Sequence, residues 1–510
     1  MNIQSNNYQK TLFTFATALV GAGLFIVSAP PANAASVWYV ATNGTDNSSC
    51  GSTTSPCASI QYVLANKVAA GDTVKVKAGT YNIPSGSSGN HKINNVTKHQ
   101  NITITAEDPN NRPLLKFYGN TSNPFTIEKG VKGVTISYLK IDGGSVTRGQ
   151  AGLIRVDDNP TVLDHLLIYN GCGGIYINTA KRVTVSNSVV HTQGLPETDP
   201  NMANQDCTAI TMVNFGSVTG DNIPATGWNE KTYIYNNEVY TSGDGFIPVD
   251  VDYKYIEVAY NNFHDNWEDG IDMKNVQYLR IHHNKLHDNW GAGIMTPVKQ
   301  YALDIEIYNN EIYNNGWAGI TCNSESPGLK QRWKIYNNLI YNNAIDPTRL
   351  PPWEGYGINM PGGQGHEIYH NTVYNNGNVD NSVGKSGGGI LAYGAIIKNN
   401  IFYNNNGDKG NIAAAGIADY NYVYPTSPGI TGTNAITVSD PKLKNPPGND
   451  FSLLTNSPLI NIGTDVGVTT DFVENMRPQG SGFDIGAYEG ASSGTDNTSP
   501  ATPQGLIKIK

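Results

Sequence analysis

The stretch Ile335-Tyr-Asn-Asn-Leu-Ile-Tyr341 decides the fold, because variants of these seven residues recur between residues 234 and 403. Close copies begin at five other isoleucines: Ile234, Ile281, Ile307, Ile368 and Ile397. A looser copy at 258–264 fits with a one-residue slip before its Asn pair. Counted on the second Asn, the copies fall at 237, 262, 284, 310, 338, 371 and 400, one copy every 22 to 33 residues.

A second phrase alternates with the first: a Gly that follows two variable residues and precedes one apolar residue. It occupies seven stretches: 172–175, 243–246, 268–271, 291–294, 317–320, 355–358 and 387–390. Each repeat should therefore hold two short strands, a sharp turn at the Asn and a longer, variable connection. Because so small a unit cannot bury its apolar face alone, we expect the units to stack into parallel sheets around one core.

These features predict an all-β chain that forms a single-stranded right-handed parallel β-helix, a solenoid with one coil per repeat. We expect the recurring Asn to adopt the left-handed backbone of a tight bend and to hydrogen-bond the Asn of the next coil in a ladder. A leucine-rich repeat would show a Leu consensus and a propeller blade needs about 40 residues, so neither fits.

The N-terminus has the pattern of a signal peptide over residues 1–34: Lys10, an apolar stretch at 12–27, and Ala32-Asn-Ala34. The apolar stretch is short and broken by Thr and Gly, which disfavours a membrane anchor. We therefore expect a secreted, extracellular protein, free or associated with the cell surface, with no membrane span in the mature chain.

The mature chain divides into four predicted parts. An N-terminal cap with the first coils occupies 35–130, where a helix at 59–68 covers a solenoid end that would otherwise be an unpaired sheet edge. The β-helix repeats follow at 131–439 and a C-terminal closing segment at 440–490. Residues 491–510 have the Ser/Thr/Pro-rich composition of a linker and tail.

Charge and cysteine content restrict the partners. The net charge is −9 and 15% of the 510 residues are charged, so we do not expect the basic face that nucleic acid binding requires. We also expect a monomer. Cys50 and Cys57 share a Gly/Ser/Thr-rich loop, where an oxidising compartment favours a disulfide. Cys172 and Cys207 are candidates for a second bridge, which leaves Cys322 over. The spacings do not resemble a zinc site.

Acidic residues coincide on two consecutive repeats. Aligned on the Gly of the second phrase, the coils place Asp244 and Asp269 at the same position. Adjacent strands lie about 4.8 Å apart, so these carboxylates would repel each other unless a cation or shared proton lay between them. Glu268 and Asp272 add two acids. The set suits Ca²⁺, which binds about six to eight oxygens; a solvated acidic patch is the alternative.

The repeats resemble the pectate-lyase-like right-handed β-helix superfamily. The ending, Arg477-Pro-Gln-Gly480 with Asp484-Ile-Gly-Ala-Tyr-Glu489, is similar to the closing segment of bacterial cell-surface β-helix proteins. The acids resemble family 9 of the pectate lyases, where an Asp on one coil and an Asp-Asp-Gly-x-Asp cluster on the next hold a catalytic calcium. The resemblance implies metal ligands at four positions: Asp244, Asp269, Asp272 and, in place of an Asp, Glu268.

The catalytic base is where the chain departs from that family. The family's base is a Lys directly after the Gly-x-Gly-apolar phrase of the following coil, and this chain has Met295 there. Lys274 and Lys299 are the nearby substitutes. Lyase chemistry needs a base that removes the proton α to a uronate carboxylate, while calcium neutralises that carboxylate and lowers the pKa of the proton.

Four further residues are candidate substrate contacts. Trp267 and Trp290 each lie three residues before the aligned Gly, so we expect their rings to stack and to offer platforms for sugar rings. His283 and Lys285 follow on the next strand and bend. Aromatic residues that only stabilise stacked coils, or exposed side chains of a solenoid, would account for the same positions.

Three functions stay open. The first is a calcium-assisted lyase that acts on an acidic polysaccharide such as pectate. The second is a glycoside hydrolase in which Asp244 and Asp269 serve as acid and base without calcium. The third is a non-catalytic cell-surface or carbohydrate-binding protein, which the missing family Lys and the closing segment favour.

Overall fold

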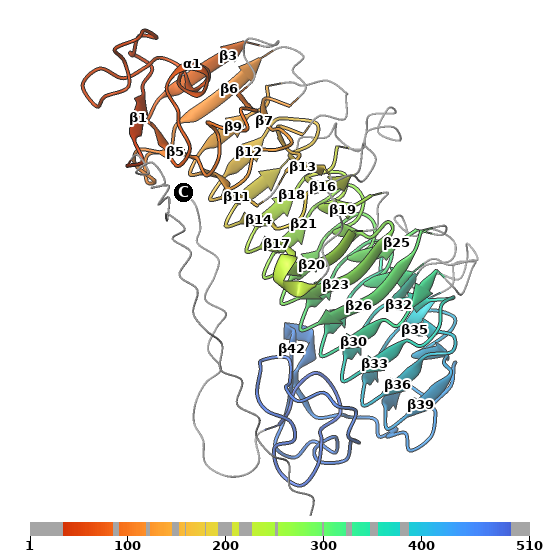
Figure 1. Ribbon diagram of the computed structural model, residues 1–510. Helices are drawn as coiled ribbons and strands as arrows, with labels where there is room; N and C mark the ends of the chain where they lie inside the picture. Colours follow the sequence, from red (N-terminus) through yellow and green to blue (C-terminus); the bar gives the residue numbers. More distant parts are fainter. Residues whose placement is uncertain are drawn as a thin grey trace, which may run out of the picture. The chain divides into compact units, whose positions relative to one another are not determined.

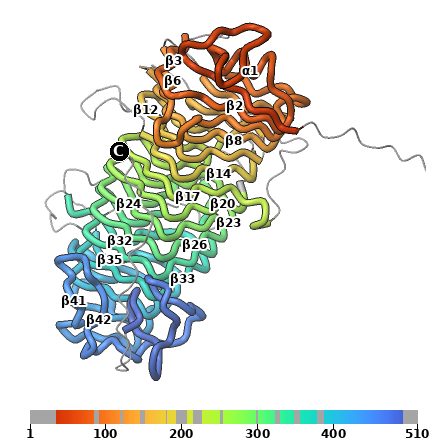
Figure 2. Tube along the Cα trace, turned by 90° about the vertical axis from the view of Figure 1, so that its left-hand side faces the viewer, coloured from red at the N-terminus to blue at the C-terminus, as the bar shows by residue number. Residues whose placement is uncertain are grey.

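The computed structural model describes residues 34–84, 91–118, 123–144, 152–158, 160–178, 180–191, 207–213, 227–249, 253–297, 300–322, 329–346, 355–377 and 387–490. Through these residues the chain winds in successive coils, and three parallel sheets, A, B and C, run along the solenoid (Figures 1 and 2). The predicted parallel β-helix is confirmed. A full coil holds three strands rather than two, because the seven-residue phrase itself spans the end of one strand and all of the next.

Sheet A contains 15 strands in the described residues: β1 (Val37–Val40), β2 (Thr73–Val76), β5 (Thr103–Ala106), β8 (Val134–Ser137), β11 (Thr161–Asp164), β14 (Val183–Ser186), β17 (Thr232–Tyr235), β20 (Tyr253–Ala259), β23 (Val276–His282), β26 (Ala302–Tyr308), β29 (Lys330–Gln331), β30 (Lys334–Tyr336), β33 (Glu367–Tyr369), β36 (Ile396–Lys398) and β39 (Ile417–Asp419).

Sheet B contains 13 described strands: β3 (Thr80–Pro84), β6 (Leu114–Tyr118), β9 (Lys140–Asp142), β12 (Leu167–Tyr169), β15 (Val189–His191), β18 (Glu238–Tyr240), β21 (Asn262–His264), β24 (Lys285–His287), β27 (Glu311–Tyr313), β31 (Leu339–Tyr341), β34 (Thr372–Tyr374), β37 (Ile401–Tyr403) and β40 (Tyr422–Tyr424).

Sheet C contains 12 described strands: β4 (His91–Ile93), β7 (Phe125–Ile127), β10 (Ile154–Val156), β13 (Ile175–Asn178), β16 (Ile210–Val213), β19 (Phe246–Pro248), β22 (Ile271–Asp272), β25 (Ile294–Thr296), β28 (Ile320–Cys322), β32 (Gly355–Met360), β35 (Gly387–Ala392) and β38 (Ile412–Ala414).

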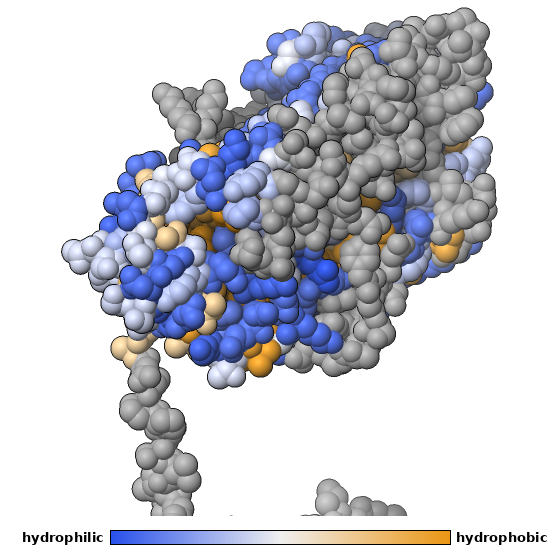
Figure 3. All heavy atoms as spheres, turned by 90° about the horizontal axis from the view of Figure 1, so that it is seen from above, coloured by the Kyte–Doolittle hydropathy of each residue, from blue (hydrophilic) through white to orange (hydrophobic). Residues whose placement is uncertain are grey.

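One continuous core fills the solenoid, because inward residues of successive strands stack in register. In sheet A a fully buried column runs through Ile234, Val258, Ile281, Ile307, Ile335, Ile368 and Ile397. Burying one such side chain contributes roughly 1.5–3 kcal/mol. Outward positions are more polar, and Figure 3 shows a face on which hydrophilic residues predominate among the described atoms.

A ladder of buried Asn side chains follows the turn from sheet A to sheet B, where each amide donates to the next over 2.9–3.0 Å: Asn237, Asn261, Asn284, Asn310, Asn338, Asn371, Asn400 and Asn421. Two expectations are wrong. In the copy at 258–264 the ladder residue is Asn261 rather than Asn262, so this copy has the same spacing as the others and no one-residue slip. The left-handed residue is the one before each ladder Asn, for example Asn309 with a φ of 52°, because a residue that bends the chain cannot also point its amide inward.

A second Asn ladder, which the sequence analysis missed, follows the turn from sheet B to sheet C: Asn266, Asn289, Asn315, Asn343, Asn376, Asn405 and Asn411. Its signal is an Asn two residues after the last aromatic residue of the seven-residue phrase, as in Tyr341-Asn-Asn343. Two ladders satisfy the buried turn backbone on both sides of sheet B.

The N-terminal end is covered by helix α1 (Ile60–Asn66) and by a loop with the disulfide Cys50–Cys57. Ser59 caps the helix by accepting a hydrogen bond from the Tyr62 N–H. The loop pairs with the outer edge of β1, since the Tyr39 N–H donates to the Gly51 carbonyl oxygen and the Cys57 N–H to that of Tyr39. The structure also joins Cys172 to Cys207 and leaves Cys322 buried and unpaired.

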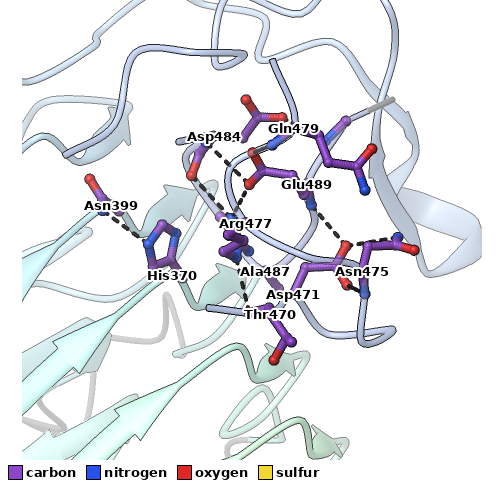
Figure 4. A network of polar contacts seen from close by, with 12 residues as sticks. His370, Asn399, Thr470, Asp471, Asn475, Arg477, Gln479, Asp484, Ala487 and Glu489 are labelled. Atoms are coloured by element: carbon purple, nitrogen blue, oxygen red, sulfur yellow. Dashed lines mark hydrogen bonds and ion pairs between the residues drawn. The ribbon is translucent and has the colours of Figure 1, made fainter. Parts of the chain in front are cut away.

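The closing segment, with the antiparallel pair β41 (Leu443–Asn445) and β42 (Asp450–Leu453), packs on outer residues of sheet B and bonds to Asn337 and Asn399 of the turn from sheet A to sheet B. Its anchor is Arg477, which forms a 2.6 Å ion pair with Glu489; neither side chain is exposed (Figure 4). Arg477 also donates to the Gly486 carbonyl oxygen and to Asn337 of the solenoid. No helix among the described residues has the length and hydropathy needed to cross a bilayer.

Candidate metal centre

Three aspartates converge where sheet B turns into sheet C. Asp244 lies two residues before β19, Asp269 two residues before β22, and Asp272 ends β22. The backbone sets their register, because the Gly245 N–H donates to the Asp269 carbonyl oxygen over 3.0 Å. One carboxylate oxygen from each aspartate lies within 4.8 Å of those of the other two. The structure thus brings together three of the four predicted ligands.

All three aspartates are buried, with 2 to 4% of each residue exposed. Asp244 Oδ1 accepts a 3.1 Å hydrogen bond from the Asp269 N–H, and Asp269 Oδ1 accepts a 2.5 Å bond from the Ala292 N–H. Asp272 Oδ2 forms a 2.7 Å ion pair with Lys274, whereas Asp272 Oδ1 is buried without a hydrogen-bond partner. An unpaired buried carboxylate oxygen is costly, which is the situation that a bound cation relieves.

The glycine at position 291 makes room for this arrangement. A Cβ atom there would collide with Asp269 Oδ1 and with the Glu268 backbone. Gly291, which lies two residues before the recurring glycine of its coil, therefore serves the site, since only a residue without a side chain lets the next coil approach the carboxylate.

Burial and mutual repulsion dominate the electrostatics. Burial raises the pKa of Asp244 well above its usual range, and the charges of Asp272, Glu268 and Asp269 raise it further. Burial raises the pKa of Asp272 as well, against the opposing charge of Lys274. Burial by itself would lower the pKa of Lys274, but the adjacent carboxylates, Asp272 foremost, raise it. Glu268 adds charge without belonging to the group of three whose oxygens converge.

A coil that the sequence pattern did not reveal precedes the centre. Ala209 takes the place of the recurring Gly, because its N–H donates to the Asp244 carbonyl oxygen over 3.0 Å. Thr208 and Thr211, whose hydroxyls bond to each other, therefore occupy the coil positions that Asp269 and Asp272 occupy two coils later. The sequence signal for this coil is that Thr208 and Thr211 have the same spacing as Asp269 and Asp272. It was missed because Ala209 replaces the glycine on which the repeats were aligned.

On the following coil, Met295 is the strand neighbour of Asp272, so an apolar side chain lies beside that aspartate. Lys299 lies outside the described residues. Of the two proposed bases, Lys274 is therefore the one whose amine is placed, in direct contact with Asp272.

The two tryptophans lie on neighbouring coils, but the expectation that they stack is wrong. Among the described rings, Trp290 meets Trp317 edge-on, with centroids 5.6 Å apart, and has no ring contact with Trp267. The Trp290 indole packs toward the following coil, and edge-to-face contact is a favoured arrangement of aromatic rings. The Nε1–H groups of Trp267 and Trp317 are buried without partners.

His283 and Lys285 lie on a different side of the coil. His283 occupies the turn between sheets A and B, stacks on Tyr260 and lies 3.3 Å from Glu474 of the closing segment. Lys285 begins β24 in sheet B and pairs with Glu311 over 3.2 Å. Because a coil has three faces, closeness in sequence does not place these two side chains beside the aspartates, and a substrate role there is not supported.

The comparisons with known proteins found one family model and several solved structures that are similar to this chain. The family model "Right handed beta helix region" matches residues 201–395. The pectate lyase Pel9A is 18% identical, with a TM-score of 0.42 over 89% of this chain and 96% of that one. The Azotobacter vinelandii mannuronan C-5 epimerase AlgE4 A-module is 14% identical, with a TM-score of 0.43 over 72% and 90%. XylC in complex with xylose is 11% identical, with a TM-score of 0.49 over 89% and 99%. No curated protein matches the chain.

The converging ligand atoms restrict the kind of metal ion that the centre can bind. The converging atoms are carboxylate oxygens alone, without sulfur or imidazole nitrogen. Hard divalent cations such as Ca²⁺ prefer such oxygens, whereas softer metals favour thiolate or imidazole ligands. The cluster is therefore suited to a hard cation, and the free Asp272 Oδ1 is one ligand atom available for it.

Proposed function

We propose that this right-handed parallel β-helix protein belongs to the pectate-lyase-like superfamily and is a secreted lyase that cleaves a pectate-like, uronate-containing polysaccharide by calcium-assisted β-elimination. The observation that carries the proposal is the buried group of Asp244, Asp269 and Asp272 with an unpartnered oxygen on Asp272. Buried like charges at this spacing are unfavourable without a cation, and structural needs of the coil alone do not call for them.

The residues fit calcium as a resident ion. Asp244, Asp269 and Asp272 would hold it, with Glu268 as an additional nearby charge, and the remaining coordination positions would accept water or substrate oxygens. When bound, the ion supplies positive charge that neutralises the uronate carboxylate and makes its α-proton more acidic.

Lys274 is the candidate base for this elimination. The carboxylates alone raise the pKa of Lys274 and favour its ammonium form, whereas a dication bound beside it would disfavour that charge. The Nζ, once neutral, would take the proton at C5 of the uronate, the C5–H electron pair would form the C4=C5 double bond, and the C4–O bond would break toward the leaving sugar. The proton then passes from Nζ to the leaving oxygen or to water. Lys274 contacts Asp272 directly, and its side chain is 29% exposed, so the amine can reach a substrate in solvent.

Substrate contacts are proposed for Trp267 and Trp290 at the same turn. Both side chains are partly exposed. The unpartnered Trp267 indole N–H is a donor that a sugar hydroxyl can satisfy. The signal-peptide pattern and two disulfides support export to an oxidising, extracellular location.

The test is incubation of the mature chain with polygalacturonate, with and without chelator. We expect the ultraviolet absorbance of an unsaturated uronate to increase with time. The increase should stop when chelator is added and resume when calcium is restored. Asp272→Asn should lower the rate by at least about 100-fold, since it removes a ligand charge. Asp265→Asn, an exposed acid of the same coil that pairs with His264, is the control and should retain the rate.

Other outcomes select the alternatives. New reducing ends without absorbance, independent of chelator, would indicate a hydrolase. Binding without cleavage for every uronate polymer tried would indicate a non-catalytic carbohydrate-binding protein. Either result would refute the lyase proposal and leave the fold unaffected.

A further inference from the structure

We infer that the Lys274 ammonium competes with the divalent cation for Asp272 and thereby limits the affinity of the centre for that cation. The inference rests on the proposed function, because it concerns the same carboxylates. It adds to that function an effect of Lys274 on ion binding that is separate from proton transfer.

The contact is direct. Asp272 gives one oxygen to Lys274 at 2.7 Å, and an oxygen of the same carboxylate lies within 4.8 Å of oxygens on Asp244 and Asp269. A cation held among the three aspartates would therefore lie a few ångströms from the ammonium. Like charges at such a separation in a buried, weakly screened place repel strongly, so ammonium and dication cannot both be bound without loss of affinity.

The Lys274 ammonium can move away from the aspartates while the backbone of Lys274 stays in place. The Lys274 N–H donates to the Pro248 carbonyl oxygen of the preceding coil over 3.0 Å, which fixes the start of the side chain. The Asp272 side chain is 5% exposed, whereas that of Lys274 is 29% exposed. A long, flexible lysine at a solvent boundary can move its ammonium into water at little cost, while the buried aspartate cannot move.

The same pair would stabilise the chain when no cation is bound. The charges of Asp272, Glu268 and Asp269 act on Asp244, and Lys274 forms an ion pair with Asp272. The ammonium partly neutralises the buried charge, so that folding does not depend wholly on metal. The affinity for the divalent cation then depends on how readily it displaces the Lys274 ammonium from Asp272.

The experiment measures calcium affinity by titration calorimetry on the mature, metal-stripped chain. Lys274→Met should bind calcium at least about tenfold more tightly than the wild type, since the repulsion is gone. Lys274→Arg keeps the charge and should stay within about threefold of the wild type. Lys444→Met, which removes an exposed lysine paired with Asp450 in the closing segment, is the matched control and should not change the affinity.

The outcomes are separable. Equal or weaker binding by a folded Lys274→Met variant, or equal tightening in the Arg variant, would overturn the inference. Loss of lyase activity together with tighter binding would support it, because a merely structural lysine would lose both when removed. If the wild type bound neither calcium nor magnesium, the proposed function would fail first, and the inference with it. Folding of each variant is checked by circular dichroism before titration.

Discussion

At the residue scale, neighbouring positions with similar chemistry carry different tasks. Asn309 bends the chain at a φ of 52°, while Asn310 is fully buried and continues the ladder. Similarly, Asp269 is packed against the next coil and receives a backbone N–H, whereas Asp272 has one oxygen on an ammonium and one oxygen unpaired. Such differences arise from which way a backbone position faces, which composition does not report.

The first residue-scale prediction concerns Asp244→Asn. Without divalent cations the variant should be as stable as the wild type or more so, because an amide of the same shape removes a buried like charge. Calcium should raise the melting temperature of the wild type and leave the variant unchanged. Scanning calorimetry in chelator and in calcium measures both effects, and a large destabilisation in chelator would contradict the prediction.

A second residue-scale prediction uses the close approach at position 291. Gly291→Ala should weaken calcium binding by at least about tenfold, because the added methyl group must displace the Asp269 carboxylate. Gly467→Ala, in the closing segment, is a control for the loss of a glycine, since nothing lies near its Cβ position although its φ of +72° adds local strain. Calcium titration of both variants distinguishes a local effect on the centre from general destabilisation.

At the element scale, the turns on both sides of sheet B depend on buried side-chain ladders rather than on turn residues alone. Asn310 donates to Asn338 and to two backbone carbonyl oxygens, and accepts from Asn284. Each interior rung thus satisfies groups on its own coil and on both neighbours. A solenoid whose coils contact only their neighbours depends on such nearest-neighbour terms for its stability.

The element-scale prediction follows from the hydrogen bonds that Asn310 makes. Asn310→Ala should destabilise the local coils by about 3 kcal/mol, because several buried polar groups lose their partners. Asn309→Gly should cost at most about 1 kcal/mol, since glycine adopts the left-handed backbone readily. Native-state hydrogen exchange of residues 281–340 reports the difference, and equal losses in both variants would show that the ladder is dispensable.

At the scale of the whole molecule, the closing segment ties the last coils to residues far away in sequence. Asn337 and Asn399, both turn residues of the solenoid, bond to the backbone at Thr470 and Thr464. Burial raises the pKa of Glu489 to about 7 despite its ion pair with Arg477. We therefore expect the buried pair to fix the position of the closing segment more than to add net stability.

The whole-molecule prediction is a double-mutant cycle on that pair. Arg477→Met alone should cost about 3–5 kcal/mol, because it leaves the Glu489 carboxylate buried and unpaired. The double variant Arg477→Met with Glu489→Met should recover part of this loss. Thermal unfolding together with proteolysis of residues 440–490 measures the release of the segment, and additive losses would argue against a coupled pair.

The sequence by itself determined that the chain is a parallel β-helix, because the repeat length, the alternation of apolar residues and the recurring Asn are local properties of one coil. It also brought Asp244, Asp269 and Asp272 into one hypothesis, since in a solenoid equal positions in adjacent repeats become neighbours. Only the tertiary structure decided that a coil has three strands and that Thr208 and Thr211 belong to a further coil. It also decided that His283 and Lys285 lie in the turn from sheet A to sheet B and in sheet B, rather than in the turn that carries Asp244 and Asp269. Side-chain direction and coil register depend on the number of residues between turns, and irregular connections change that number without leaving a local signal.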